Sequence, residues 1–305
     1  MDRLEAMRLF TRVVDRRSFT QAAHDRGVPR STATQVVRQL EERLGVRLLQ
    51  RTTRTVRPTL DGEAYYRRCL AILDDVEDAE GAFRGAAPKG VLRIEVQGTL
   101  ARHFLTPGLP GFFERYPGIE IAMSESERWV DVVREGVDCA LRFGVLPDSD
   151  LVARQVTMLE RITVAAPAYL ARFGRPQTPH DLPRHRQIGL RSITTGALRP
   201  FEFVSASGAV VRAGDIPAPY SVTGTESFRD GVLLGLGLAQ MPVFHVADDL
   251  AEGRLERVLA DYRVPSMPVS VLYPRNRQLS PRVRLFIDWA VEQFATSGPL
   301  IRQER

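Results

Sequence analysis

The stretch that decides the fold runs from Ser18 to Thr59 and reads SFTQAAHDRGVPRSTATQVVRQLEERLGVRLLQRTTRTVRPT. Ser18 and Gln21 have the spacing of a capping box, which satisfies two otherwise unpaired amides at the start of a helix. Gly27 can adopt the left-handed conformation that ends such a helix. A second helix is predicted from about Arg30 to Leu44. We therefore expect two short helices that are joined by a tight turn.

The second helix has one apolar and one polar face. Apolar residues follow each other at spacings of four, three and four, which places them on a single stripe that faces a core. They are Ala33, Val37, Leu40 and Leu44. The other face carries side chains that hydrogen-bond base edges or phosphates in a major groove. They are Ser31, Thr34, Gln35 and Arg38, and we expect Arg30 and Thr32 in the first turn to contact DNA as well.

Arginines continue beyond this helix. Residues 50–57 are predicted to form a β-hairpin wing, in which Arg51, Arg54 and Arg57 contact phosphates. Residues 1–60 contain 13 arginines, no lysine and six acids, a formal charge of +7, whereas the whole chain carries +5. This asymmetry favours a polyanion partner, double-stranded DNA, for the N-terminal part. The alternative is a solvated helix pair with incidental arginines. The helix caps, the helical period and the charge all favour a DNA-binding segment over that alternative.

Residues 40–51, LEERLGVRLLQR, together with Thr59 and Gly62, resemble the most specific run of LysR-type transcriptional regulators. The resemblance covers essentially the whole chain. It implies an α/β protein with an N-terminal winged helix-turn-helix, a long linker helix, and a two-lobed effector domain similar to periplasmic solute-binding proteins. The chain departs from the family at three positions. Pro29 replaces a common serine or threonine cap, Gln35 a common arginine or lysine, and Leu49 a frequent phenylalanine.

The resemblance and the residue patterns together predict three parts. A DNA-binding domain is expected over 1–59, a linker helix over 60–87, and an effector domain over 88–305. Lobe one is expected at about 88–161 and 268–296, and lobe two at about 162–267.

The linker helix is predicted to form a dimer. Its apolar or small positions recur at alternating spacings of four and three, which is the pattern of a heptad seam. They are Tyr65, Cys69, Ile72, Val76, Ala79 and Phe83. A lone helix has nowhere to bury such a stripe. The alternative is an amphipathic helix that packs on its own effector domain. The family resemblance favours a homodimer on a pseudo-palindromic operator, and a homotetramer through added effector-domain contacts.

In the C-terminal two-thirds, predicted strands alternate with predicted helices, which indicates a largely parallel sheet with helices on its faces. Strands are expected at 91–96, 119–123, 139–143, 161–166 and 269–273. Helices are expected at about 102–116, 130–135, 228–238 and 282–294.

Strand ends and helix starts converge between two such lobes, where small molecules bind. We predict a small anionic effector there, contacted by Thr99, Trp129, Arg142, Phe201 and Ser227. Thr99 and Ser227 would lie at helix starts whose amides suit an anion, and Arg142 offers a forked cation. Trp129 and Phe201 would supply flat apolar walls. The alternatives for these residues are plain helix capping, a surface ion pair or a packed aromatic ring.

Composition argues against other classes of protein. The 305 residues are 44% apolar and 26% charged, as in ordinary soluble proteins. We find no signal-peptide pattern and no membrane-spanning apolar run, so we expect a cytoplasmic protein without a membrane partner. An exported solute-binding protein is therefore disfavoured. Cys69 and Cys139 are expected to be buried thiols, although a redox role remains open.

A cytosolic enzyme is the second rival hypothesis. The chain has a single lysine, Lys89, and five scattered histidines, and it lacks a nucleophile elbow or a phosphate loop. These observations predict no catalytic residues, no metal and no cofactor.

Overall fold

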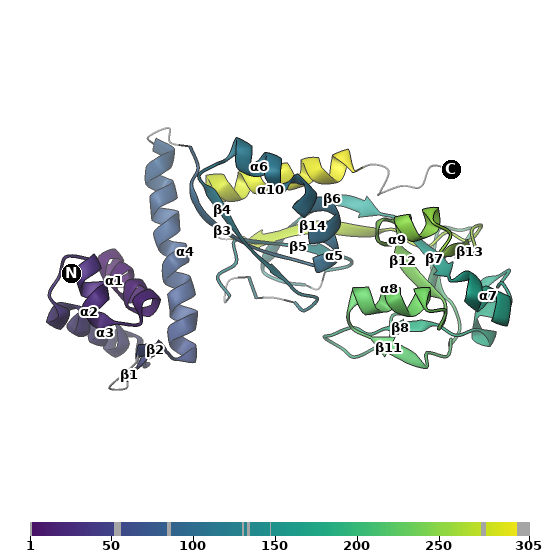
Figure 1. The fold of residues 1–305 in the computed structure, drawn as a ribbon, viewed down its shortest axis with the longest axis horizontal. Helices are drawn as coiled ribbons and strands as arrows, with labels where there is room; N and C mark the ends of the chain where they lie inside the picture. The colour runs from purple at the N-terminus through teal and green to yellow at the C-terminus, as the bar shows by residue number, and fades with distance from the viewer. Residues whose placement is uncertain are drawn as a thin grey trace.

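The protein is elongated, with a helical head at one end and two α/β lobes towards the other, as Figure 1 shows. The computed structural model describes residues 2–51, 56–83, 87–129, 131–132, 135–146, 148–275 and 279–297. The head contains three helices and one hairpin. They are α1 (Arg3–Arg16), α2 (Phe19–Asp25), α3 (Arg30–Leu44), β1 (Leu49–Arg51) and β2 (Val56–Pro58). Helix α4 (Leu60–Phe83) leads from the head to the lobes.

Local signals place the helices of the head as predicted. The Ser18 side chain accepts a hydrogen bond from the Gln21 amide at 3.3 Å, and Gly45 ends α3 with φ 71°. Leu44 was expected in the core but is 42% exposed, whereas Val36 is buried. The reason is that α3 packs against both α1 and α2, so it buries a wider stripe at its middle than one seam predicts.

Lobe one is built on a five-stranded sheet with the strand order β4-β3-β5-β14-β6. The strands are β3 (Gly90–Val96), β4 (Ile119–Glu125), β5 (Cys139–Phe143), β6 (Leu151–Leu159) and β14 (Met267–Pro274). β4, β3 and β5 are parallel, but β14 is antiparallel to both β5 and β6. Four of the five strands therefore run in the same direction, as the prediction of a largely parallel sheet requires, and only β14 is reversed. The cause is topological, because β14 returns from lobe two against the direction of its neighbours.

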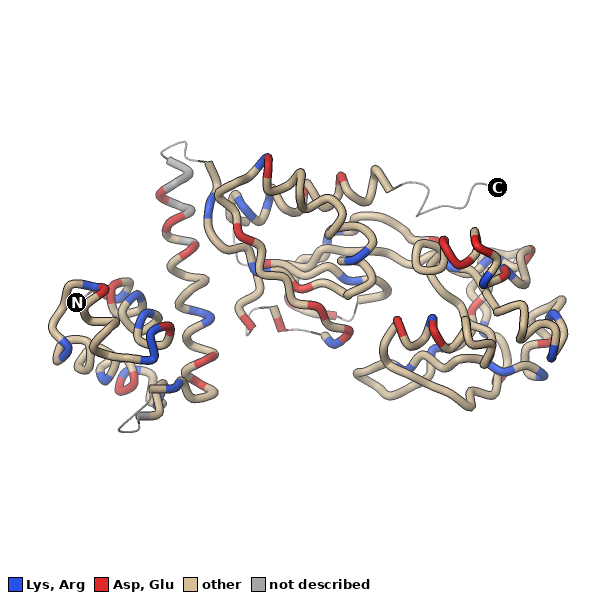
Figure 2. The backbone as a smooth tube through the Cα atoms, viewed as in Figure 1, with Lys and Arg blue, Asp and Glu red and all other residues tan. Residues whose placement is uncertain are grey.

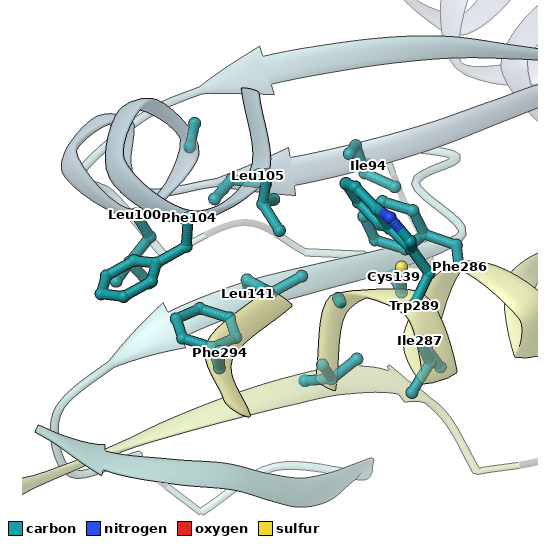
Figure 3. Packing of buried hydrophobic residues seen from close by; sticks show 14 of the residues in the cluster. Ile94, Leu100, Phe104, Leu105, Cys139, Leu141, Phe286, Ile287, Trp289 and Phe294 are labelled. Atoms are coloured by element: carbon teal, nitrogen blue, oxygen red, sulfur yellow. The ribbon is translucent and has the colours of Figure 1, made fainter. Parts of the chain in front are cut away.

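Helical segments cover this sheet. They are α5 (Gly98–Leu100), a π-helical turn (Ala101–Leu105), a 3₁₀ turn (Thr106–Gly108), α6 (Leu109–Arg115) and α10 (Pro281–Thr296). The continuous helix expected at 102–116 is interrupted, since Pro107 and Pro110 each begin a new helical segment. Figure 3 shows side chains of α10 packed against this part of lobe one. The ring centroids of Phe104, in the π-helical turn, and Phe294, in α10, lie 4.5 Å apart.

Lobe two is built on the antiparallel sheet β12-β7-β13, contrary to the parallel prediction, although residues 188–190 and 220–222 of this lobe pair in parallel. Its strands are β7 (Arg161–Ala165), β8 (Ile188–Leu190), β9 (Glu202–Val204), β10 (Val210–Arg212), β11 (Tyr220–Val222), β12 (Ala239–Pro242) and β13 (Glu256–Val258). Its helices are α7 (Pro167–Phe173), the 3₁₀ helix Pro179–Arg184, α8 (Thr225–Leu233) and α9 (Val243–Ala251).

The helix predicted at 228–238 ends at Leu233 because the chain must turn tightly there. Gly235 has φ 70°, and a Cβ at Gly237 would lie 2.8 Å from the Arg186 carbonyl oxygen. Of the helix predicted at 130–135, three residues lie outside the described residues, and the others form no helix.

Helix α4 packs on the head of its own chain. Cys69 is buried in the core of the head, and the ring centroids of Tyr65 and Phe10 are 5.3 Å apart. The first two positions of the predicted dimer seam are therefore used within one chain. Ile72 is 39% exposed, while the side chains of the last two seam positions, Ala79 and Phe83, lie outside the described residues.

The joint between head and linker depends on one glycine. The Thr59 amide donates to the Leu48 carbonyl at 2.9 Å, and the Thr59 hydroxyl accepts from the Gly62 amide at 2.9 Å. A Cβ at Gly62 would lie 1.8 Å from the Leu48 carbonyl oxygen. Only glycine allows the first turn of α4 to approach the hairpin this closely.

Both cysteines are buried thiols. Burial raises the pKa of Cys69 to about 11 and also raises the pKa of Cys139. Neither thiol therefore forms the reactive thiolate readily. Within the described ranges, no helix has the length and apolarity needed to cross a bilayer.

Candidate DNA-binding surface and effector cleft

The outer face of α3 presents most of the predicted DNA-contacting side chains to solvent. Arg30, Ser31 and Gln35 are exposed, and Thr32 is half-buried. Thr34 is also half-buried, and its hydroxyl donates to the Arg30 carbonyl at 3.1 Å. This bond leaves the Thr34 oxygen free only as an acceptor.

Arg38 is exposed on the same helix. Its Nε donates to Glu42 Oε1 at 2.8 Å, so its charge is partly neutralised one turn later.

The hairpin places one predicted wing arginine on the surface. Arg57 is exposed and pairs with Gln50 in the β1–β2 register. Arg54 and the side chain of Arg51 lie outside the described residues.

Ion pairs divide the basic residues of the head into two groups. Arg12 and Arg16 both donate to Asp25 at 2.6 Å, which lowers the pKa of that carboxyl group. Arg30 and Arg57, by contrast, make no ion pair with the described part of the chain. Within the described residues, the charges of Arg30 at the start of α3 and of Arg57 on the wing are therefore available to DNA. Figure 2 shows basic segments over the head and mainly acidic ones along α4.

A cavity of about 120 Å³ opens between the two lobes. Thr99, Trp129 and Phe201 line it, so the structure brings three of the five predicted effector contacts together. Arg142 lines only an adjoining cavity of about 260 Å³. Ser227 is exposed on α8 and lines neither cavity, whereas Thr225 and Phe228 of the same helix line the first one.

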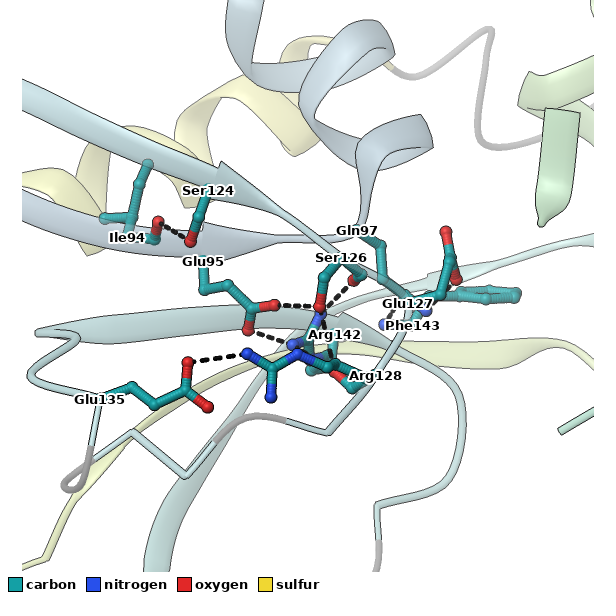
Figure 4. A network of polar contacts seen from close by, with 10 residues as sticks. All are labelled: Ile94, Glu95, Gln97, Ser124, Ser126, Glu127, Arg128, Glu135, Arg142 and Phe143. Atoms are coloured by element: carbon teal, nitrogen blue, oxygen red, sulfur yellow. Dashed lines mark hydrogen bonds and ion pairs between the residues drawn. The ribbon is translucent and has the colours of Figure 1, made fainter. Parts of the chain in front are cut away.

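Arg142 is held in a buried network, which Figure 4 shows. Its guanidinium pairs with Glu95 and donates to the carbonyl oxygens of Ser126 and Arg128 at 2.9 Å each. The Ser126 hydroxyl donates to the other Glu95 oxygen at 2.6 Å. Arg142 is 4% exposed and Glu95 is 2% exposed. Arg142 thus joins β3, β5 and the loop after β4, an arrangement unlike the free forked cation that the sequence suggested.

Two family models match this chain, one over its N-terminal part and one over its C-terminal part. Residues 4–63 match the bacterial regulatory helix-turn-helix protein, lysR family, and residues 85–295 match the LysR substrate binding domain. The chain belongs to the LysR family of transcriptional regulators. It is therefore a DNA-binding regulator that carries a substrate-binding effector domain.

Full-length relatives support the same assignment for this LysR-type regulator. It is 37% identical to the uncharacterized HTH-type transcriptional regulator YhjC of Escherichia coli, covering 95% of this chain and 97% of that protein. It is 38% identical to an HTH-type transcriptional repressor of Pseudomonas aeruginosa, covering 97% and 93%. The solved structure of CrgA, a LysR-type regulator from Neisseria meningitidis, is 33% identical, with a TM-score of 0.59 and coverage of 95% and 98%.

Several residues of the cleft were not predicted from the sequence. Gln97, Glu127, Arg161 and Arg199 all line both cavities of this LysR-type regulator. Glu127 lies two residues before Trp129, which is a local signal that could have identified it. Arg161 and Arg199 lie far apart in sequence, and only the fold of lobe two brings them to the same cleft.

A second set of contacts joins the lobes beside the cleft. His103 of lobe one lies against Phe244 and His245 of α9, with ring centroids 5.2 and 6.0 Å apart. The Arg102 guanidinium lies 3.6 Å from Glu226 Oε2, and His245 Nε2 lies 3.2 Å from Glu226 Oε1. Burial lowers the pKa of both histidines. The lobes therefore meet through rings whose burial disfavours the protonated form.

Lobe one is also attached to the linker helix. Asp74 of α4 lies 3.0 Å from the Arg93 guanidinium and 3.7 Å from that of Arg282, which is 2% exposed. One carboxylate on α4 thus contacts β3 and α10 together. Part of the linker therefore packs on its own effector domain, which was the alternative to a pure dimer seam.

Proposed function

We propose that a small anionic metabolite binds in the interlobe cleft of this regulator and changes its affinity for DNA. The observation that carries the proposal is the charge of the cleft. Arg161, Arg191 and Arg199 line the cavity, whereas Glu127 is the single carboxylate among its described lining residues. A concave site with excess positive charge and apolar walls favours a small organic anion.

We infer that the contacts to DNA divide by element. The N-terminal half of α3 enters the major groove, where Gln35 and its exposed neighbours contact base edges. The wing contacts phosphates, which position the protein without specifying sequence. The full set of proposed contacts is Arg30, Ser31, Thr32, Thr34, Gln35, Arg38, Arg51, Arg54 and Arg57.

We further propose that the regulator is a homodimer, extended to a tetramer by effector domains, on a pseudo-palindromic operator. The pairing surface of α4 begins at Ile72, because Tyr65 and Cys69 are occupied by the head. Two heads would then meet half-sites separated by one helical turn, about 34 Å. Sedimentation of the full chain tests this: Ile72→Asp should shift it towards monomer, because an unpaired charge would be buried.

The proposed division into domains follows from these roles. Residues 1–59 contact DNA, 60–87 connect and pair the chains, and 88–305 bind the effector. The two contacts of Asp74 offer a route by which movement of lobe one reaches α4. To act as a useful switch, the effector must prefer one arrangement of the lobes by about 1–3 kcal/mol.

Operator binding measured with and without organic acids tests the effector proposal. An operator is selected from random duplex DNA with the full-length protein, and its affinity is followed by fluorescence anisotropy. At least one acid should change the affinity about fivefold or more. The Arg161→Gln variant should lose that response but should still bind the operator.

The matched control is Arg154→Gln on β6, which removes an exposed arginine that lines neither cavity. It should respond as the wild type does. An effect that persists unchanged in Arg161→Gln would contradict the proposed site.

A further inference from the structure

Glu127 is held in one orientation by its neighbour Gln97. The Phe143 amide donates to Gln97 Oε1 at 2.7 Å, which leaves the Gln97 amide nitrogen to donate to Glu127 Oε2 at 3.2 Å. Figure 4 shows this chain of contacts at the end of β5. The carboxylate is therefore positioned by backbone geometry and does not rotate freely.

The other oxygen of the same carboxylate reaches across the cleft. The Thr225 hydroxyl, at the start of α8 in lobe two, donates to Glu127 Oε1 at 3.3 Å. A carboxylate offers about four lone-pair positions, and these two bonds use only two of them. Burial raises the pKa of Glu127, so the protein has partly desolvated this acceptor without fully satisfying it. Such a group favours an incoming hydrogen-bond donor.

Arg161 supplies the opposite charge in the same cavity. It is 8% exposed, and its Nε has no hydrogen-bond partner in the described structure. Its contacts to oxygen are long, at 3.4 Å to Gln240 Oε1 and 3.8 Å to Glu202 Oε2, and a third nitrogen donates to the weak acceptor Met267 Sδ at 3.4 Å. Burial lowers its pKa to about 10. A buried guanidinium with an unfilled donor is a site at which a carboxylate would be stabilised.

We propose that the cleft selects carboxylates that also carry a hydroxyl or amino group, with Arg161 holding the carboxylate and Glu127 accepting from the donor. This inference rests on the proposed function. It narrows the ligand class, because the anion must also carry a hydrogen-bond donor. Thr225 keeps its bond to Glu127 when the ligand is bound, so the contact between the lobes and the contact to ligand share one carboxylate.

The size and walls of the cavity limit the ligand further. Its volume of about 120 Å³ is close to that of a cavity that takes up a benzene-sized molecule, about 150 Å³. Trp129 and Phe201 provide flat apolar surface on opposite lobes. A single substituted ring or a short chain fits this space.

Calorimetry on the full-length protein without DNA tests the inference directly. The probes are benzoate with its hydroxy and amino derivatives at each ring position, and butanoate with 3-hydroxybutanoate and 4-aminobutanoate. With the wild type, at least one substituted acid should bind about tenfold more tightly than its unsubstituted parent. Glu127→Gln should reduce that ratio to less than about threefold, because a neutral amide is a weaker acceptor.

Matched variants separate this inference from the general effector proposal. Arg161→Gln should weaken substituted and unsubstituted acids alike, whereas Glu120→Gln, an exposed carboxylate at the other end of β4, should change neither. If Glu127→Gln does not fold by circular dichroism, Glu127→Asp replaces it. The shorter carboxylate should lower the ratio at least about threefold.

The outcomes are distinguishable. If acids bind without preference for a donor, or if the preference survives in a folded Glu127 variant, the inference is wrong and the anionic effector proposal stands. If no probe binds the wild type at about 10 mM, the ligand class inferred here is wrong, and the operator-binding test decides the anionic effector proposal.

Discussion

The head and the effector cleft use arginine in opposite ways. In the head, the proposed DNA-contacting Arg30 and Arg57 are exposed and lack ion pairs with the described residues. In the cleft, Arg142 and Arg161 are at least nine-tenths buried. Exposed charges attract phosphates at little cost in stability, whereas buried charges must be compensated within the protein or by a ligand. The role of the exposed arginines can therefore be predicted from sequence, whereas the role of the buried ones depends on partners that only the fold supplies.

Within the cleft, the two buried arginines differ from each other. Arg142 has a carboxylate partner and two carbonyl acceptors, so it is fully engaged. Among the described residues, Arg161 has long contacts to oxygen, a bond to the weak acceptor Met267 Sδ, and an Nε without a partner. The first therefore serves the stability of lobe one, and the second is the better candidate for binding an anion.

The largest expected effect is the loss of the buried pair. Arg142→Met removes the guanidinium partner of Glu95, which is 2% exposed, and should lower the free energy of unfolding by about 3–5 kcal/mol. Arg161→Met should cost less than half as much, because it removes a guanidinium that is poorly compensated already. Urea denaturation followed by circular dichroism measures both. Equal losses would show that the two arginines are not used differently.

The next effect concerns the joint that carries the head. Gly62→Ala should lower the free energy of unfolding by about 1–3 kcal/mol, because its Cβ would meet the Leu48 carbonyl oxygen. Gly111→Ala in α6 is the control, since a Cβ there has no neighbour within 4 Å. It should be neutral or stabilising by up to about 1 kcal/mol. A Gly62→Ala protein as stable as the wild type would contradict the close approach.

Substitutions at the exposed, proposed DNA-contacting positions should weaken DNA binding without changing the stability of the protein. Gln35→Ala should cost about 1–3 kcal/mol on the selected operator and relax its specificity, whereas Arg57→Ala should weaken all duplex DNA and reduce the salt slope by about one. Gel shifts on operator and random DNA at several salt concentrations measure both effects. If Gln35→Ala weakens both DNAs equally, its base-contacting role is wrong.

The smallest expected effect is a pH dependence at the contact between the lobes. Burial lowers the pKa of His103 and His245 below 6.5, so the unfolded chain binds more protons than the folded one just below that pH. Stability should therefore fall as pH decreases through 6.5, and be fully present above it. Melting temperatures between pH 7.5 and 5.5 measure the fall. His103→Gln with His245→Gln should reduce it, and His180→Gln, at an exposed position, should leave it unchanged.

Prediction from sequence succeeded where the signal is local. The helix start at Ser18 and the glycine that ends α3 depend on neighbours a few positions away, and the charge of residues 1–60 is a sum that needs no structure. The interactions of a helix cap or a left-handed turn are short-range. The sequence run that matched the LysR family lies in this same region.

Prediction failed where partners come from distant elements. Leu44 became exposed and Val36 buried because two helices flank α3. Tyr65 and Cys69 left the expected dimer seam because α1 covers them. Nothing near Arg142 in sequence indicates Glu95, which is 47 residues earlier.

The sequence by itself therefore determined the class of this protein, the elements of its head and the existence of two α/β lobes. Only the tertiary structure decided which arginine of the cleft is neutralised, that Ser227 faces away from both cavities, and that Glu127 meets Thr225 across the lobes. The physical reason is the distance along the sequence over which each effect acts. Propensity, capping and net charge add up along the chain, whereas the charge state and availability of a buried side chain depend on partners that only folding brings within hydrogen-bonding distance.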